Sequence, residues 1–475
     1  MWNLKKYQSN TAVIDDYGHT LTYADLFEKI KDISSHLLPR KLCFIFCSNS
    51  LGSLLSYISS IENKTVPVLL SCDLDKDARL NLISLYKPQY IFCKSNTLLE
   101  YPSFEVETEF SDYSLLKSKS DQNYIIHSDL ALLLSTSGTT GNPKLVRLSY
   151  RNLECNTDQI VSYLNIDERQ RAITSLPMYY TYGLSVINTH LKAGATVLLT
   201  DKSILQKEFW SFFKYYKATS FSGVPYTYMM LDRLKVYSMD LPSLQILTQA
   251  GGHLNSSLQL KFGKFCNETG KSFFIMYGQS EASARMSYLD KSLVTEKIDS
   301  IGIPIKGGQF FIADENLNRI DKANTVGELV YQGENVCLGY ATSYLDLQLG
   351  DKNKGTLYTG DFAYFDDDGF YYITGRKKRF VKVFGNRINL NDIDKIIYDN
   401  FENIEFATYG IDDQIYIFIE DENIGKAIKA AIAQKTKINP VAFKIMSIES
   451  LPRNASGKIS YSDLSKIIEK NKHFR

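Results

Sequence analysis

The chain has 475 residues, and because hydrophobic cores stop growing at roughly 250 to 300 residues, at least two domains are expected. Hydrophobic residues make up 44% and charged residues 23%, which is ordinary globular usage and excludes a disordered or fibrous chain. The formal net charge of +1 provides no overall attraction to nucleic acids or acidic membranes, so a dedicated nucleic-acid binder is not expected.

The first residues, MWNLKKYQSN, lack the apolar stretch of a secretory signal, and no run approaches the ~18 apolar residues of a membrane span. We therefore expect a cytoplasmic protein without a membrane span. The seven cysteines are scattered without CxxC spacing, which argues against disulfides and structural zinc. Cys43 and Cys47 lie in the apolar run KLCFIFCS, where packing in a buried strand is a better interpretation than metal binding.

Short apolar runs alternate with longer amphipathic stretches such as SLGSLLSYISSIEN through the first part of the chain. The runs are KLCFIFC, TVPVLL, RAITSLPM, ATVLLT, ATSFSGVP, LQILTQA and KSFFIMYG. This alternation predicts an α/β fold with parallel strands covered by helices. Such a sheet binds ligands at the carboxyl ends of its strands, where turns expose backbone N–H groups.

The sharpest local motif is STSGTTGNPK (135–144), which follows the apolar run DLALLL. Glycines permit a tight backbone, hydroxyls donate hydrogen bonds and a lysine adds positive charge, so the motif predicts a polyphosphate-binding loop. A Ser/Thr/Gly-rich surface turn would explain the hydroxyls but not the order that ends in Pro143 and Lys144. A conventional Walker loop fits poorly, because Leu145 stands where a magnesium-binding Ser or Thr should follow the lysine.

The sequence changes character after about Lys322, where the strand-like pieces GELVYQG and FYYITG precede the highly charged GRKKRFVKVFGNRINLNDIDKII. We place a domain boundary near Lys378, which gives domains 1–377 and 378–475. Strand-like IEFATYG and QIYIFIE, helical IGKAIKAAIAQKT and a closing helix predict that the second domain is a small α+β domain.

Taken in order, the motifs resemble those of the adenylate-forming superfamily of acyl-CoA synthetases, peptide-synthetase adenylation domains and luciferases. After STSGTTGNPK they are LPMYYTYG, QAGGHL, YGQSE, GELVYQGENVCLGY, YTGD, GRKKRFVKVFGNR and NASGK. The resemblance runs from about residue 12 to 460. It implies a large multi-sheet N-terminal domain, which binds ATP and the acid, and a small mobile C-terminal domain.

By this resemblance, the two phosphate groups at the far end of ATP lie against the loop formed by Thr136, Ser137, Gly138, Thr139, Thr140, Gly141 and Lys144. The nucleotide is further bound by Gly251, Gly252, Tyr277, Gly278, Gln279, Ser280, Asp361, Arg376 and Lys382. Within this set Tyr277 would stack on adenine, Asp361 would accept both ribose hydroxyls, and Arg376 would reach ribose or phosphate. Without the motif, Asp361 would be a turn or cap residue.

Glu281 in YGQSE is implied as the magnesium ligand, since a hard oxygen donor suits a hard cation. The superfamily's usual threonine is Ser280 here, which keeps the hydroxyl. Outside the motif, a glutamate after a strand would usually be a solvated side chain.

Lys458 in NASGK matches the lysine that bridges the carboxylate and the α-phosphate, and we expect Lys458, Glu281 and Lys144 to be the catalytic residues. Lys378 matches the hinge, although the run from Arg376 to Arg379 is also consistent with a solvated basic turn. Lys382 and Gly385 match the loop that faces the acceptor.

The acid pocket is expected at Tyr180, Gly183, Gly252 and Gln279. Where amino-acid-activating domains have an aspartate, this chain has Tyr180, so an α-amino acid lacks its countercharge. Tyr179, Tyr180 and Tyr182 would favour a small or medium acid with polar substituents, and core packing explains them equally well. A second departure is Leu145, where the superfamily often has glycine.

The expected function is ATP- and Mg²⁺-dependent conversion of a carboxylic acid to acyl-AMP with release of pyrophosphate, followed by transfer to the thiol of coenzyme A. Transfer to an acyl carrier protein's phosphopantetheine thiol is the first alternative. A non-catalytic binding protein of the same fold and a luciferase-like oxygenase are further alternatives.

Overall fold

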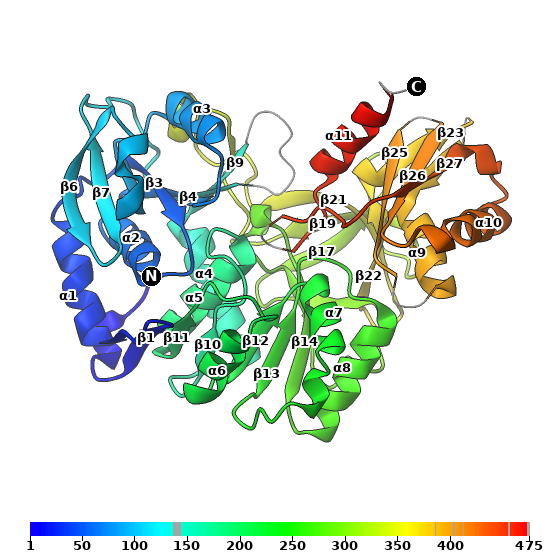
Figure 1. Cartoon of the computed structure of the whole chain (residues 1–475), viewed down its shortest axis with the longest axis horizontal. Helices are drawn as coiled ribbons and strands as arrows, with labels where there is room; N and C mark the ends of the chain where they lie inside the picture. The colour runs from blue at the N-terminus through cyan, green and yellow to red at the C-terminus, as the bar shows by residue number, and fades with distance from the viewer. Residues whose placement is uncertain (136–143, 385, 402–403, 412, 455–456, 473–475) are drawn as a thin grey trace. The chain divides into compact units, whose positions relative to one another are not determined.

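The computed structural model describes residues 1–135, 144–384, 386–401, 404–411, 413–454 and 457–472 (Figure 1). The chain divides into two compact units, and each is described by itself. The larger unit comprises Met1–Ile298, Gly302–Gln309 and Tyr331–Leu357, and the smaller unit comprises Asp299–Ile301, Phe310–Val330 and Tyr358–Arg475. We predicted a domain boundary and hinge near Lys378. The division into two compact units does not test that boundary, which stays a prediction.

The first sheet of the larger unit has eight strands in the order β20-β9-β8-β4-β3-β5-β7-β6. Its parallel centre consists of β3 (Leu42–Cys47), β4 (Val66–Ser71), β5 (Tyr90–Lys94) and β8 (Leu130–Ser135). Its antiparallel edges are β6 (Phe104–Phe110), β7 (Tyr113–Ser118), β9 (Leu145–Ser149) and β20 (Gly339–Ala341). Every residue of β3 is buried, including Cys43 and Cys47, so the predicted buried strand is confirmed.

The second sheet of the larger unit runs β15-β14-β13-β12-β10-β11-β1-β2. Its strands are β1 (Thr11–Asp15), β2 (Thr20–Thr22), β10 (Arg171–Ile173), β11 (Thr196–Leu199), β12 (Ser220–Gly223), β13 (Ile246–Gln249), β14 (Ser272–Tyr277) and β15 (Ser287–Leu289). From β1 through β14 neighbouring strands are parallel, and β2 and β15 close the ends as antiparallel strands. Turns that carry Gly251 and Gly278 therefore leave the carboxyl ends of two adjacent strands.

Helices cover both sheets of the larger unit. They are α1 (Tyr23–Ser34), α2 (Leu51–Glu62), α3 (Lys76–Tyr86), α4 (Tyr150–Leu164), α5 (Thr181–Ala193), α6 (Lys207–Tyr215), α7 (Pro225–Arg233) and α8 (Ser256–Glu268). One core cluster contains Ile45 of β3, Ile58 of α2, Ile187 of α5 and Val197 of β11, so α2 and α5 pack between the two sheets. Because α2 is buried on all sides, its residues are apolar or small along the whole helix.

The smaller unit contains a sheet ordered β18-β17-β19-β21-β22, the hairpin β23–β24 and a three-stranded sheet β25-β26-β27. The strands are β17 (Gln309–Ala313), β18 (Arg319–Ile320), β19 (Gly327–Gln332), β21 (Thr356–Phe365), β22 (Tyr371–Arg376), β23 (Phe380–Val383), β24 (Asn386–Asn389), β25 (Phe406–Ile411), β26 (Gln414–Ile419) and β27 (Phe443–Ser447). Helices α9 (Leu390–Asn400) and α10 (Gly425–Thr436) share a core with β23 and β26, and α11 (Tyr461–Lys472) packs on β25 and β26. The predicted α/β class with a small C-terminal α+β sheet is confirmed.

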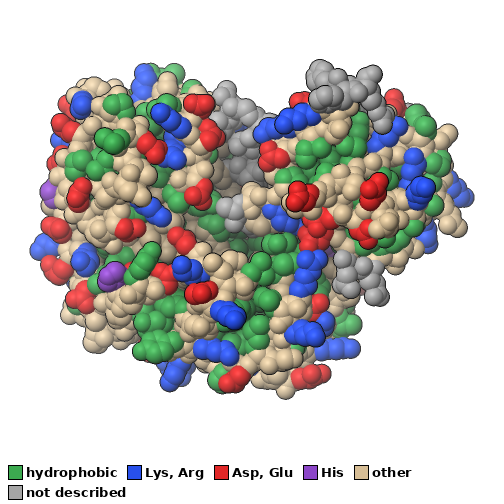
Figure 2. Space-filling view, viewed as in Figure 1, with side chains coloured by type: hydrophobic (Ala, Val, Ile, Leu, Met, Phe, Trp, Pro, Cys, Tyr) green, Lys and Arg blue, Asp and Glu red, His purple; other side chains and the backbone are tan. Residues whose placement is uncertain are grey.

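The surface carries both signs of charge. On the face that Figure 2 shows, Lys and Arg side chains are interspersed with Asp and Glu side chains, as expected for a net charge of +1. Among the helices that the structure describes, none combines the length and the apolar character that crossing a membrane requires.

Candidate nucleotide and acid site

A lysine, a tyrosine and a glutamate from three separate segments of the larger unit lie together. Lys144 immediately precedes β9, and its Nζ lies 5.5 Å from the ring centroid of Tyr340 in β20. The Tyr340 hydroxyl donates a hydrogen bond of 2.8 Å to Glu281 Oε1. The lysine predicted to bind phosphate and the carboxylate predicted to bind metal are therefore both in contact with one aromatic ring.

Tyr340 is held as a hydrogen-bond donor in this cluster. Burial raises the pKa of its hydroxyl well above the ordinary value, and the negative charge of Glu281 raises the pKa further. The phenol consequently stays protonated at neutral pH. Backbone pairing of β20 with β9 sets Tyr340 opposite Val146, two residues after Lys144, which fixes the ring beside the lysine.

The turn that carries Glu281 leaves β14 and closes tightly on itself. A Cβ at Gly278 would lie 1.7 Å from the carbonyl oxygen of Ala284, so only glycine fits there. The hydroxyls of Ser280 and Thr181 are 2.7 Å apart, and the Glu281 carbonyl accepts the Cys337 N–H at 2.8 Å. The YGQSE motif thus places its carboxylate by backbone contacts, and Ser280 supplies a hydroxyl contact.

Glu281 fits a magnesium ion whose other ligands are phosphate oxygens and water. Tyr340 contacts only Oε1, and Mg²⁺ typically binds through one or two carboxylates together with substrate phosphates. Among the described residues no group of three or more His, Cys, Asp or Glu side chains forms a metal cage. A single carboxylate matches a metal that arrives with a triphosphate.

The residues predicted to face adenine gather at the carboxyl ends of β13 and β14. Gly251 has a φ of +86°, in the left-handed region that favours glycine. A Cβ at Gly252 would lie 3.1 Å from Pro225 Cγ, and the Gly252 carbonyl accepts a hydrogen bond from Gln249 at 2.9 Å. On the next strand, Gln279 Nε2 lies 3.4 Å from the Tyr277 hydroxyl.

Tyr180, the predicted pocket residue, is the N-cap of α5 and is partly buried. Burial raises the pKa of its hydroxyl to about 12, against the opposing effect of the Arg285 charge. Tyr182 is buried, and its hydroxyl contacts Thr248 Oγ1 at 2.8 Å, so core packing accounts for this second tyrosine. A Cβ at Gly183 would lie 2.3 Å from the Pro177 carbonyl oxygen, which gives this glycine a packing reason.

Asp361 and Arg376 pair in the smaller unit. They are register partners across β21 and β22, and Arg376 Nε donates to Asp361 Oδ1 at 2.6 Å. Arg379 also has a carboxylate partner, with its Nη1 2.7 Å from Asp394 Oδ2. The basic run is therefore not a purely solvated turn.

Lys458 contacts Asn454 in the smaller unit. Its backbone N–H donates to Asn454 Oδ1 at 3.0 Å, and the Asn454 N–H donates to its carbonyl at 2.8 Å. The neighbouring Arg453 forms an ion pair of 2.9 Å with Glu405. Lys382 is exposed in β23, and the backbone of Lys378 lies in the 3₁₀ turn Lys377–Arg379. The predicted phosphate-loop residues 136–141 and Gly385 lie outside the described residues.

Comparison with known proteins decides the family. The sequence profile described as AMP-binding enzyme matches residues 1–341. The chain belongs to the AMP-binding enzyme family. Oxalate–CoA ligase of Saccharomyces cerevisiae is 28% identical over 351 residues, which are 70% of this chain and 62% of that protein. Long-chain-fatty-acid–CoA ligase of Bacillus subtilis is 26% identical over 360 residues, which are 73% of this chain and 63% of that protein.

Solved structures agree on the fold of this AMP-binding enzyme. O-succinylbenzoate coenzyme A synthetase of Bacillus subtilis, in complex with ATP and magnesium ion, superposes with a TM-score of 0.77 at 22% identity. The match covers 97% of this chain and 98% of that one. The matched segment spans less than two thirds of the length of these two curated relatives.

Tyr340 is one residue of this AMP-binding enzyme whose role the sequence did not predict. It lies within the motif GELVYQGENVCLGY, but no role followed from the motif alone. The signal appears only when β20 is known to pair with β9, because that pairing brings Tyr340 beside a lysine almost two hundred positions away. Leu145, the departure from glycine, is fully buried at the start of β9 and packs in the core.

Proposed function

We propose that the protein uses Mg-ATP to convert a carboxylic acid to its acyl-AMP, with release of pyrophosphate, and then transfers the acyl group to the thiol of coenzyme A. The observation that supports this proposal is that Lys144 and Glu281 both contact Tyr340, the lysine at its ring and the glutamate at its hydroxyl. A cation and a carboxylate that share one neighbour would suit a triphosphate with its metal ion. The curated relatives at 26–28% identity are CoA ligases by name, which favours coenzyme A as the acceptor.

The reaction needs charge control more than proton transfer. An ionised carboxylate oxygen forms a bond to the α-phosphorus, the bond from that phosphorus to the bridging oxygen breaks, and pyrophosphate leaves. Lys144 would attract the leaving phosphates, and Glu281 would hold magnesium, which offsets the phosphate charge. Tyr340 would keep Glu281 oriented by donating to one of its oxygens.

The smaller unit would supply the remaining contacts. Asp361, which is buried and accepts a hydrogen bond from Arg376, is suited to accept the ribose hydroxyls. Lys458 would bridge the reacting carboxylate and the α-phosphate, and Lys378 would be the hinge. The cytoplasm is the proposed compartment, since the described cysteines are free thiols, which persist under reducing conditions.

Pyrophosphate release tests the proposal directly. The purified protein is assayed with ATP, Mg²⁺ and a panel of carboxylic acids, beside Lys458→Ala and the control Lys426→Ala, an exposed lysine of the same unit. We expect Lys458→Ala to lose at least about 100-fold in adenylation rate and the control to match wild type. Equal rates in all three proteins would remove the role of Lys458, and no release with any acid would favour a non-catalytic binding protein. Acyl transfer to pantetheine but not to coenzyme A would point to a carrier protein.

A further inference from the structure

Arg285 is a buried cation in the larger unit that the proposed adenylation does not use. It lies between Glu281 and β15, and only 2% of the residue is exposed. The side-chain amides of Asn156 and Asn335 donate to its backbone carbonyl at 2.9 Å and 3.0 Å. The backbone at this position is therefore fixed, and the guanidinium is aimed inward.

The guanidinium of Arg285 has neutral partners. Its Nε lies 3.2 Å from the sulfur of Met276, its Nη1 donates to Ser185 Oγ at 3.0 Å, and its Cζ lies 4.0 Å from the ring centroid of Tyr182. A hydrogen bond with Arg285 also opposes the effect of burial on the pKa of Tyr163. No carboxylate of the described residues forms an ion pair with it. A buried arginine normally has a charged partner.

Tyrosine hydroxyls surround this cation. The positive charge of Arg285 opposes the effect of burial on the pKa of Tyr163, Tyr180 and Tyr182, so all three phenols lie within its electrostatic reach. The Tyr163 ring stacks on Tyr288 with centroids 4.2 Å apart, and its hydroxyl contacts the Met276 sulfur at 3.0 Å. The tyrosines Tyr163, Tyr180 and Tyr182 thus form an aromatic surface around Arg285, and this surface is called the tyrosine wall.

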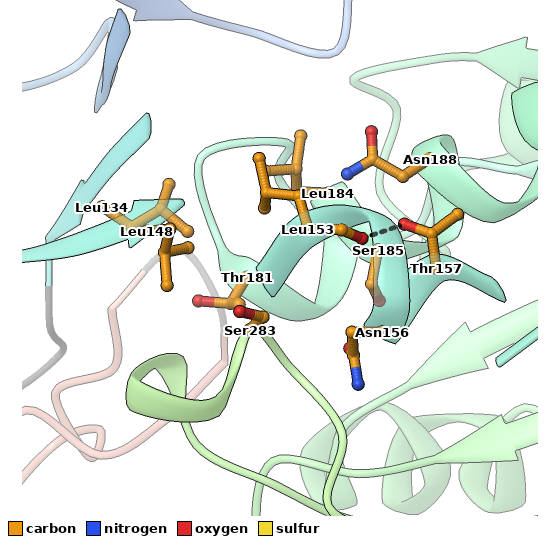
Figure 3. A pocket seen from close by; sticks show the side chains of 10 residues that line it. All are labelled: Leu134, Leu148, Leu153, Asn156, Thr157, Thr181, Leu184, Ser185, Asn188 and Ser283. Carbon is orange, nitrogen blue, oxygen red and sulfur yellow. Dashed lines mark hydrogen bonds between the residues drawn. The ribbon is translucent and has the colours of Figure 1, made fainter. Parts of the chain in front are cut away.

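This wall is built on the elements that carry the proposed acid site. Arg285 follows Glu281 in the same turn, Met276 immediately precedes Tyr277, and Ser185 lies on α5 one turn beyond Tyr180. A small cavity of about 10 Å³, enough for roughly one water molecule, lies nearby. Ser185, which contacts the guanidinium, and Asn156, which contacts the Arg285 backbone, line it together with Thr181 and Ser283 (Figure 3). Polar side chains and a small space are thus present beside Arg285.

Building on the proposed acid activation, we infer that Arg285 selects the substrate class. The acid carries a second carboxylate, which the guanidinium binds while the first carboxylate is activated. Arginine suits this role because its planar fork binds a carboxylate through two parallel hydrogen bonds. Acids that end in a bare hydrocarbon chain are disfavoured, because they offer the buried cation no countercharge.

Matched pairs of acids test the inference in wild-type protein. Succinate is compared with butyrate, glutarate with valerate, and adipate with hexanoate, by kcat/KM for pyrophosphate release. We expect the preferred dicarboxylic acid to exceed its monocarboxylic partner by about 100-fold. A wild-type preference for the monocarboxylic acids, or equal values for each pair, overturns the inference.

Two variants separate selectivity from packing. In Arg285→Met the dicarboxylic acid should lose about 100-fold in kcat/KM and the monocarboxylic acid less than about threefold, whereas Arg285→Lys should keep part of the preference because it keeps the charge. An equal loss with every acid identifies a merely structural arginine. If neither variant folds, the wild-type preference decides alone.

Failure of the proposed function is distinguishable from failure of this inference. If no acid releases pyrophosphate, calorimetric titration of the ATP-free protein with the same pairs still measures which acids bind. Tighter binding of the dicarboxylic acid, lost in Arg285→Met, sustains the inference, and binding without that preference overturns it.

Discussion

Two buried arginines of the larger unit, Arg147 and Arg285, differ in what surrounds them. Arg147 in β9 is fully buried, and its guanidinium donates to the carbonyl oxygens of Leu338, Tyr340, Leu349 and Gly350. Arg285 meets a thioether, hydroxyls and an aromatic ring. Burial alone therefore does not reveal the role of an arginine. We expect the carbonyl acceptors of Arg147 to make it a stabilising residue, whereas we infer a ligand-binding role for Arg285.

The comparison predicts that Arg147→Met is the more damaging substitution. It would leave buried carbonyls without donors and release the segment that carries Tyr340, so the free energy of unfolding should fall by about 4 kcal/mol. Urea denaturation measures the loss. Arg151→Met, at an exposed arginine on the neighbouring helix, should leave stability nearly unchanged. A stable Arg147→Met would break the comparison.

His190 sharpens the comparison because a histidine, unlike an arginine, can lose its charge. Burial lowers its pKa from 6.5 to about 4. Since the unfolded chain binds the proton at higher pH than the folded one, the stabilisation is complete above pH 6.5 and is lost as pH falls toward 4, by about 3 kcal/mol. Denaturation of wild type and His190→Gln from pH 7 to 4.5 should show a weaker acid dependence in the variant. If the stability of both proteins depended on pH in the same way, His190 would not be a buried histidine with a lowered pKa.

Arg285→Met should cost the fold little. Replacing a buried, poorly satisfied cation by an apolar chain of similar length is often near neutral, so the free energy of unfolding should change by less than about 1.5 kcal/mol. Denaturation under the conditions used for Arg147→Met gives the comparison. A loss as large as that of Arg147→Met would show that both arginines are structural.

The smallest expected effect concerns Tyr340, whose backbone carbonyl accepts a hydrogen bond from Arg147. Tyr340→Phe keeps the ring beside Lys144 and removes the hydrogen bond to Glu281. Adenylation should slow about tenfold and require more Mg²⁺ for half-maximal rate, while stability is retained. A titration of the initial rate with Mg²⁺ measures this. An unchanged magnesium requirement would show that Tyr340 does not orient the carboxylate.

The sequence predicted the strands and motif order, because hydrophobic runs and glycine turns are local signals. KLCFIFC and KSFFIMYG became β3 and β14, and YGQSE followed β14 as a turn. The roles of Arg147, Arg285 and Tyr340 were not predictable. Arg147 finds its acceptors some 190 positions later in the chain, and whether a buried cation is satisfied depends on such distant contacts. Residues 136–143 lie outside the described residues, so the phosphate-binding loop stays a prediction.

The pairing of Asp361 with Arg376 has a consequence for nucleotide choice. The Asp361 side chain is only 2% exposed, whereas that of Arg376 is 57% exposed. The carboxylate is therefore largely desolvated when the chain folds, before a nucleoside arrives. If Asp361 accepts the ribose hydroxyls as proposed, 2′-deoxyadenosine triphosphate offers this buried acceptor one hydroxyl fewer, so we expect discrimination against deoxynucleotides.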